Sequence, residues 1–216
     1  MAEAGLFDIM YSTRSMRKLK TDPIPDEVLY KILEAGSQAP SGTNTQHWRF
    51  LVVKDPEVKK KVQAIYQKGW SEARAMYDKR PGPEHMAAEK FGRLLNAATH
   101  LADHLAEAPV LIFACLKERP LPPQLASRLA RMAGSSIYPA VQNMLLACRA
   151  FGIGATLTTV ASLHEDELKK VLGLPDDVNT YALLPLGYPL GKFGRVSRLP
   201  VEEVTCLDQW GKAYKK

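Results

Sequence analysis

Three short apolar segments, set far apart along the chain, limit what it can fold into. They are "WRFLVV" at residues 48–53, "VLIFACL" at 110–116 and "YALLPLG" at 181–187. Each has the length of a strand, and the first two are rich in β-branched and aromatic residues, so each segment is expected to form a core strand. The stretches between them are longer and mostly carry helical periodicity, so helices are expected to outnumber strands. With 216 residues, 46% of them hydrophobic, the chain can bury the core of a single domain spanning residues 1–216.

Five segments have the apolar spacing of amphipathic helices, at residues 24–39, 55–66, 94–105, 137–151 and 162–172. Asp55 is expected to cap the second helix, because its carboxylate can accept hydrogen bonds from free amides of the first turn. Gly152 and Gly173 are expected to end the fourth and fifth helices, because glycine readily adopts the left-handed conformation that follows a helix. Ser162 and Glu165, three positions apart, predict a capping box at the start of the last helix.

Three further segments lack such clear periodicity. Residues 67–93, around the turn "KRPGPEH", are predicted to be a mobile excursion between helices and a candidate lid. Residues 117–123, "KERPLPP", are expected to form a proline-rich loop. Residues 188–216 form a tail with scattered apolar side chains, which favours a tail packed on a surface that can belong to a second subunit.

The net charge and the cysteine pattern exclude some classes of protein and leave others open. The formal charge of +6 and the pI near 9.2 favour an anionic partner, which can be a nucleic acid, a membrane surface or a phosphorylated small molecule. The longest apolar run, at 108–116, is half of the roughly 18 residues that a membrane helix needs, and the first residues have no signal-peptide pattern, so a cytoplasmic protein is expected. Cys115, Cys148 and Cys206 are too far apart to indicate a disulfide framework or a metal site.

The sequence resembles some familiar catalytic motifs but completes none of them. "GIGATL" at residues 152–157 begins like a dinucleotide-binding fingerprint, but Leu157 stands in place of the third glycine and a helix precedes the motif. His100 and His104 have metal-ligand spacing, yet Leu101 stands where a zinc protease needs glutamate, so a polar helix face is the preferred interpretation. No serine, cysteine or kinase catalytic motif was found.

Two arginine-containing segments at opposite ends of the chain suggest an anion site. In "TRSMR", Arg14 and Arg17 flank Ser15, so two guanidinium groups and a hydroxyl can converge on one phosphate. In "GRVSRLP", Arg195 and Arg198 lie in an extended tail that can reach the same phosphate. Surface arginines in a charged turn are the alternative.

Two loops rich in small polar residues add hydrogen-bonding groups. The stretch "QAPSGTNTQHWRF" offers Ser41, Asn44 and Gln46 to the edge of a flat polar ligand, although a turn stabilised by its own hydrogen bonds fits these residues equally well. "TLTT" at 156–159 offers Thr158 and Thr159 with their backbone amides, and its alternative is an ordinary strand end.

Taken in order, "TRSMR", "APSGTNTQHW", "GIGATLTT" and "LLPLGYP…RLPVEEV" resemble the successive landmarks of the nitroreductase family of FMN-dependent flavoproteins. The resemblance runs from about residue 8 to residue 204. It implies an α+β fold, with helices around a small, mainly antiparallel sheet, and a homodimer that exchanges its C-terminal tails. It also implies that the flavins lie at the dimer interface.

The resemblance also implies which residues bind FMN. Arg14, Ser15 and Arg17 would hold the flavin phosphate and the pyrimidine side of the ring, and Arg198 would complete the phosphate site. Thr158 and Thr159 would lie near N5 of the flavin ring. The loop of the partner subunit would approach the same flavin through its residues Pro40, Ser41 and Asn44. His47 replaces the proline of the family's usual Q-P-W. A backbone-neutral replacement is the preferred interpretation, and the alternative is that His47 reaches the substrate side.

The implied activity is reduction of the flavin by NADH or NADPH, followed by electron transfer to an electron-poor small molecule such as a nitroaromatic or a quinone, in a ping-pong mechanism. The flavin would carry the chemistry, so no catalytic side chain is expected.

One alternative keeps the fold for reductive dehalogenation or flavin fragmentation. The substrate clamp of the deiodinase branch is not matched in residues 67–93, so iodotyrosine is not the first choice. A second alternative is a basic nucleic-acid or anion-binding module without flavin, but no such binding motif was found, and no nucleic-acid or membrane partner is expected.

Overall fold

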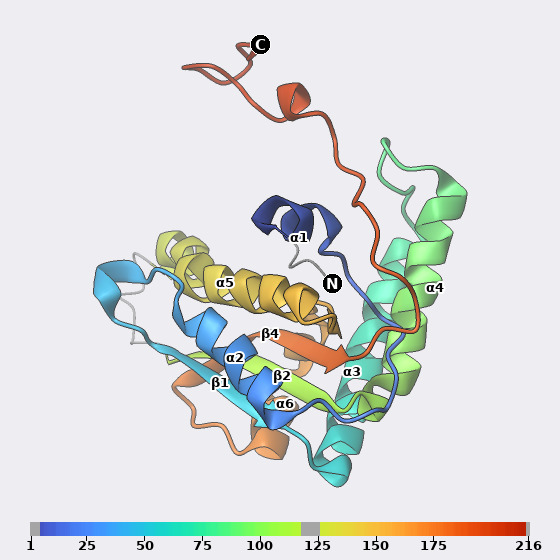
Figure 1. Cartoon of the computed structure of the whole chain (residues 1–216), viewed down its shortest axis with the longest axis vertical. Coiled ribbons are helices and arrows are strands. Elements are labelled where there is room, and N and C mark those ends of the chain that lie inside the picture. Colours follow the sequence, from blue (N-terminus) through green and yellow to red (C-terminus); the bar gives the residue numbers. More distant parts are fainter. Residues whose placement is uncertain (1–4, 118–125, 215–216) are drawn as a thin grey trace.

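The centre of the molecule is a four-stranded antiparallel sheet with the strand order β1-β2-β4-β3 (Figure 1). The computed structural model describes residues 5–117 and 126–214. The strands are β1 (Trp48–Val53), β2 (Val110–Lys117), β3 (Gly154–Ala155) and β4 (Val178–Gly187). The three predicted strands are confirmed, and so is the α+β fold with helices around a small antiparallel sheet. The two-residue strand β3 is an addition that has too short a pattern to detect.

Helices cover both faces of this sheet, which explains why β2 is a continuous apolar run. One face packs against α2 (Asp26–Ser37) and α5 (Ala126–Ala150), and the other against α3 (Pro56–Tyr77), α4 (Ala88–His104) and α6 (Glu165–Leu172). Alternate residues of β2 enter the two cores, with Ile112 on the α5 side and Phe113 on the α3 side, both fully buried. Among the described residues, no helix is both long and apolar enough to cross a membrane.

Most of the helix ends lie where the sequence places them. The Asp55 carboxylate accepts a hydrogen bond from the Val58 amide at 2.8 Å, which confirms the predicted N-cap of α3. Gly152 and Gly173 follow α5 and α6 with φ angles of 70° and 65°, as expected for residues that end helices in the left-handed region.

The predicted capping box of α6 is wrong. Residues 160–164 form a short 3-10 helix, η3 (Val160–His164), and α6 begins only at Glu165. The Ser162 hydroxyl lies 2.9 Å from the hydroxyl of Thr180, and the Glu165 carboxylate accepts a hydrogen bond from the Thr180 amide at 2.8 Å. Both side chains therefore bind strand β4 instead of capping their own helix, because tertiary partners compete successfully with local ones.

The region between the predicted helices at 55–66 and 94–105 is more regular than the sequence indicates. Helix α3 continues to Tyr77 and α4 begins at Ala88, so the irregular connection spans only residues 78–87. Helix α5 begins at Ala126, well before the predicted position 137. The predicted proline-rich loop at 117–123 lies outside the described residues from position 118 onward.

Backbone hydrogen bonds bring the two ends of the chain together. The Lys20 amide donates to Tyr188, the Leu190 amide to Lys18, and the Val196 amide to Tyr11, at 2.8, 3.0 and 2.9 Å. The chain after β4 therefore runs back along the segment that follows α1 (Leu6–Ser12). Figure 1 shows the rest of the tail, in red, leaving the body of the molecule beyond α1.

Candidate functional site

The head and the tail of the chain together line a cavity of about 290 Å³, called here the arginine pocket. It contains Arg14, Ser15 and Arg198, three of the residues predicted to bind an anion. Its full lining consists of Met10, Thr13, Arg14, Ser15, Gln142, Leu145, Ala155, Thr156, Leu157 and Arg198. Two guanidinium groups and a hydroxyl can bind a phosphate in such a pocket through charge-assisted hydrogen bonds.

Local backbone contacts position this pocket. The Met16 amide donates to the Ala155 carbonyl at 2.9 Å, which fixes the Arg14 segment beside strand β3. The side chains of Arg14 and Arg198 are exposed, and one terminal nitrogen of Arg198 donates to the neighbouring Ser197 carbonyl at 2.9 Å. A guanidinium group has five N–H donors, so most of those on Arg198 remain for a ligand.

A second cavity of about 250 Å³, the aromatic pocket, lies between α3, α4 and the turn at 157–160. Its lining residues are Arg17, Tyr66, Trp70, Tyr77, Phe91, Leu94, Leu95, Ala98, Leu157, Thr158, Thr159 and Val160. The rings of Trp70 and Tyr77 are 6.3 Å apart, and Phe91 meets Tyr77 edge-on at the same separation. Among the described residues of this lining, Arg17 is the one charged side chain. The cavity therefore suits a flat, largely uncharged ring.

Arg17, Tyr66 and Thr158 form the polar end of the aromatic pocket. Burial lowers the pKa of the Arg17 guanidinium below its ordinary value, because a charge is less stable away from water. Burial also disfavours the charged form of the Tyr66 phenol, and this raises its pKa. A hydrogen bond with Thr158 and the positive charge of Arg17 act in the opposite direction and lower that pKa. The Tyr66 and Thr158 hydroxyl oxygens lie 3.0 Å apart.

The two pockets adjoin, since Leu157 lines both of them. Arg14 and Arg17 do not share one cavity as the sequence interpretation proposed, because Arg14 lines the arginine pocket and Arg17 the aromatic pocket. The segment that carries them is extended, and side chains three positions apart in an extended chain point to opposite sides. Thr158 and Thr159 both line the aromatic pocket, as a site near a ring requires.

The loop that contains Pro40, Ser41 and Asn44 lines neither pocket within one chain. Its polar groups bind one another: the Ser41 hydroxyl accepts from the Gln46 amide, and the Asn44 side-chain oxygen accepts from the Gln46 side chain, both at 3.1 Å. Thr43, Asn44 and Gln46 all have positive φ angles near 50°. In Figure 1 this loop, in light blue, lies at the opposite end of the sheet from α4. Its predicted role at a flavin requires a second copy of the chain.

The other residues considered in the sequence lie away from both pockets. Arg195 lines a separate cavity with Asp8 and Arg149. His104 pairs with Glu107 at 2.8 Å on the exposed side of α4. No group of three or more potential metal ligands was found within the described residues.

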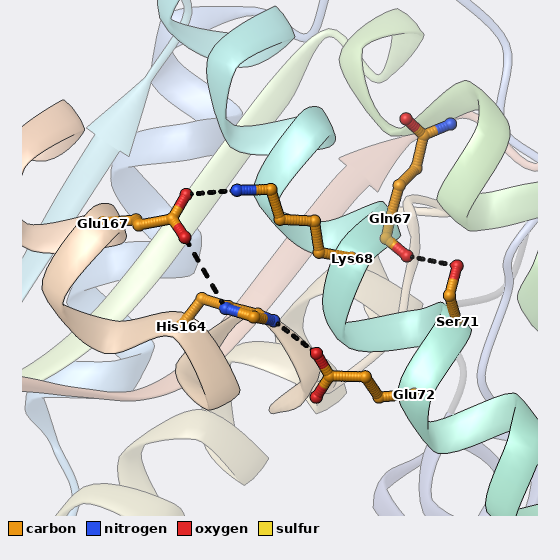
Figure 2. A network of polar contacts seen from close by, with 6 residues as sticks. All are labelled: Gln67, Lys68, Ser71, Glu72, His164 and Glu167. Atoms are coloured by element: carbon orange, nitrogen blue, oxygen red, sulfur yellow. Dashed lines mark hydrogen bonds and ion pairs between the residues drawn. The ribbon is translucent and has the colours of Figure 1, made fainter.

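Ion pairs on the outer side of α3 join this helix to η3 and α6, as Figure 2 shows. The Lys68 ammonium lies 2.6 Å from the Glu167 carboxylate. The ring of His164 lies between two carboxylates, 3.1 Å from Glu72 and 3.7 Å from Glu167. Because η3 follows directly after Thr159, this network stabilises the segment that forms one wall of the aromatic pocket.

Tyr66 lies in the helix predicted at residues 55–66, but the sequence does not indicate its place in the site. Its polar partner, Thr158, is 92 positions away along the chain, so no local pattern could have revealed the contact. Trp70, Tyr77 and Phe91 were missed because they lie in the stretch 67–93, where helical periodicity is weak. Aromatic residues recurring in that stretch were the available signal.

Comparisons with known proteins agree with this architecture. The model of the nitroreductase family matches residues 10–188. Iodotyrosine deiodinase 1 of Rattus norvegicus is 29% identical over 209 residues, covering 97% of this chain and 69% of that protein. The NADH dehydrogenase of Thermus thermophilus is 31% identical over 202 residues, covering 88% of this chain and 90% of that protein. A crystal structure of oxidized iodotyrosine deiodinase bound to FMN and 3-iodo-L-tyrosine superposes with a TM-score of 0.70 at 25% identity, covering 91% of this chain and 96% of that one. Because the family model matches most of its length, the chain belongs to the nitroreductase family.

Proposed function

We propose that this protein is an FMN-dependent oxidoreductase that uses NADH or NADPH to reduce an electron-poor small molecule such as a quinone or a nitroaromatic. The observation that carries the proposal is the pair of adjoining cavities, one cationic and one aromatic, that share Leu157. FMN has the same two-part character, because a charged phosphate is joined to a flat heteroaromatic ring. The donor set therefore fits this cofactor.

Each part of the site has a separate task in this proposal. Arg14, Ser15 and Arg198 bind the phosphate through charge-assisted hydrogen bonds. Arg17 places a poorly solvated positive charge beside the ring, where it stabilises negative charge that develops on reduction. Bound FMN would supply the transfer of a hydride from the nicotinamide and of electrons to the acceptor. The described side chains hold and orient the reactants, so the proposal needs no nucleophile or general base among them.

The lining of the aromatic pocket favours a planar, uncharged acceptor. Its described residues include Trp70, Tyr77 and Phe91 but no carboxylate. Reductive dehalogenation is the second candidate, because several relatives are iodotyrosine deiodinases. An iodinated tyrosine carries an ammonium and a carboxylate, and burying an ammonium without a partner is costly. A quinone or a nitroaromatic has no such requirement. We therefore place quinone or nitroaromatic reduction first.

We further propose that the active form is a homodimer. Leu6 and Phe7 of α1 are exposed, and Trp210 in the tail is 98% exposed. Apolar side chains in this number on one end of a molecule favour contact with another protein surface. A second copy would cover them and would bring the loop with Ser41 and Asn44 to the flavin of its partner.

The visible absorption spectrum of the freshly purified protein tests the cofactor first. A yellow protein that releases FMN on heating is expected. Steady-state assays with NADH, then NADPH, should next show turnover with menadione and nitrofurazone. Parallel initial-rate lines are expected, because donor and acceptor would occupy the same space beside the bound flavin in turn.

Three other results would overturn parts of the proposal. A yellow protein that deiodinates iodotyrosine faster than it reduces menadione would favour the dehalogenase. Intersecting initial-rate lines with a ternary complex would exclude the ping-pong mechanism. A colourless protein that does not bind FMN, but binds oligonucleotides with a steep dependence on salt, would favour the nucleic-acid-binding alternative.

A further inference from the structure

The hydroxyl of Tyr66, on α3, belongs to a buried side chain in the lining of the aromatic pocket. Tyr66 is only 2% exposed, and its ring belongs to the core cluster that includes Val62 and Ile65. The oxygen lies 3.0 Å from Thr158 Oγ1. Burying a hydroxyl without a hydrogen bond costs free energy, so the contact with Thr158, the one partner among the described residues, determines what this phenol can do.

The position of Thr158 is fixed from two sides. Its amide donates to the Leu183 carbonyl at 3.0 Å and its carbonyl accepts from the Leu183 amide at 2.8 Å, which ties the residue to strand β4. On the other side, α3 approaches the next turn so closely that a Cβ on Gly69 would overlap the Val160 carbonyl oxygen. The backbone of Thr158 is therefore held in place beside the Tyr66 phenol.

The chemistry of the Tyr66 and Thr158 hydroxyls indicates which of them donates the hydrogen bond. Burial raises the pKa of Tyr66, so the phenol keeps its proton at neutral pH. A phenol is more acidic than an aliphatic hydroxyl, so the O–H of Tyr66 is the stronger donor of the two. A hydroxyl has one donor and two acceptor positions. If Tyr66 donates to Thr158, the hydrogen of Thr158 is left for another acceptor.

We propose that Tyr66 is a positioning residue: its phenol donates to Thr158 Oγ1 and thereby directs the Thr158 hydroxyl hydrogen toward a hydrogen-bond acceptor on the ligand in the aromatic pocket. This inference rests on the proposed function, in which the ligand is the ring of FMN. Tyr66 then affects FMN through Thr158 and need not touch it. The sequence, the family resemblance and the comparisons assign no such role to Tyr66.

A double-mutant cycle on FMN affinity tests the proposal. The dissociation constant of FMN is measured by flavin fluorescence for the apo forms of the wild type, Tyr66→Phe, Thr158→Val and the double variant. Each single substitution should weaken binding by about two- to tenfold, the value of one neutral hydrogen bond. The double variant should bind no more weakly than Thr158→Val alone, because Tyr66 acts only through Thr158. The visible band of bound oxidized FMN should change in the same way in both single variants.

Controls separate this role from a general effect on folding. Tyr66→Phe keeps the buried ring, so its apo form should unfold at nearly the temperature of the wild type. Tyr138→Phe removes a more exposed phenol, which donates to the Tyr181 carbonyl at 3.4 Å outside both pockets, and should leave FMN affinity and spectrum unchanged.

Two results would overturn the inference. An undiminished effect of Tyr66→Phe in the Thr158→Val background would mean that Tyr66 acts independently of Thr158. A Tyr66→Phe protein with wild-type affinity and spectrum would remove the role of the phenol while leaving the proposed function intact. Failure of the wild-type protein to bind FMN at all would instead overturn the proposed function, together with this inference.

Discussion

At the scale of single residues, the arginines of the proposed site are divided between two adjoining pockets. Arg14 and Arg198 are exposed and line the arginine pocket, whereas Arg17 is partly buried and lines the aromatic pocket. An exposed arginine can rearrange to bind a phosphate, while a buried one exerts a fixed and weakly screened field. We infer that Arg198 contributes mainly to affinity for the cofactor and Arg17 mainly to the electronic properties of the ring.

The affinity for FMN should depend on Arg198 but not on Arg195. Arg198→Met removes charge-assisted hydrogen bonds worth about 1.5–3 kcal/mol, so FMN should bind about 10- to 100-fold more weakly. Arg195→Met removes the same charge from the same tail, but Arg195 lines a different cavity. Titration of the apo proteins with FMN measures both effects. An equal loss in the two variants would indicate a general effect of charge and would remove Arg198 from the phosphate site.

At the scale of secondary-structure elements, the packing of α3 against η3 shapes the aromatic pocket. Gly69 allows a close approach on the inner side, and the Lys68 ion pair and the His164 hydrogen bond join the elements on the outer side (Figure 2). The turn with Thr158 and Thr159 lies between β4 and this seam, so its position depends on both.

The close approach at Gly69 should make this position intolerant of a methyl group. Gly69→Ala should destabilise the protein by about 1–3 kcal/mol, because the Cβ would meet the Val160 carbonyl, which is backbone and cannot move aside freely. Gly92→Ala in α4 is the matched control, since nothing lies within 4 Å of its added Cβ. That substitution should stabilise the protein by up to about 1 kcal/mol through helix propensity. Chemical denaturation measures both, and a neutral Gly69→Ala would contradict the description of this seam.

The ion pair between Lys68 and Glu167 should contribute stability that depends on pH. The hydrogen bond from Lys68 is the main cause that lowers the pKa of Glu167 from 4.5. Because the carboxylate is stabilised in the folded state, the contribution is complete above pH 4.5 and is lost as the pH falls through the lowered pKa. Lys68→Met should therefore reduce the Tm slightly at pH 7, and the difference from the wild type should vanish in strong acid.

The matched control is Lys61→Met, on an exposed position of the same helix that has no charged partner in the described part of the chain. It should show no such dependence on pH. A Tm difference for Lys68→Met that stays constant from pH 7 into strong acid would show that lost packing, not the ion pair, causes it.

The elements were predictable where local chemistry decides them, and unpredictable where distant partners do. Asp55 caps α3 as expected because its partner, the Val58 amide, is three residues away. Glu165 does not cap α6 because Thr180, from a strand that follows later in the chain, binds it instead. The contact between Tyr66 and Thr158 has the same origin. The sequence identified the polar segments of the site, but it could not assign Arg14 and Arg17 to different pockets without knowing the path of the backbone.

At the scale of the whole molecule, the tail after β4 carries residues of both the proposed phosphate site and the proposed dimer interface. Its first part follows the N-terminal segment and brings Arg198 to Arg14. Its last part carries exposed apolar side chains, including Val204, Leu207 and Trp210. One segment therefore supplies a ligand of the proposed phosphate site and a surface that favours a partner.

Two truncations should separate these contributions. A protein that ends at Gly187 lacks Arg198 and all the exposed apolar residues of the tail, so it should lose both FMN and the dimer. A protein that ends at Thr205 keeps Arg198 but lacks Leu207 and Trp210, so its dimer should weaken while FMN binding by the dimer that remains is retained. Light scattering measures the mass, and absorbance at the flavin band measures occupancy. A stable, yellow and monomeric protein ending at Gly187 would contradict both roles of the tail, since neither the cofactor nor the fold would then need a second chain.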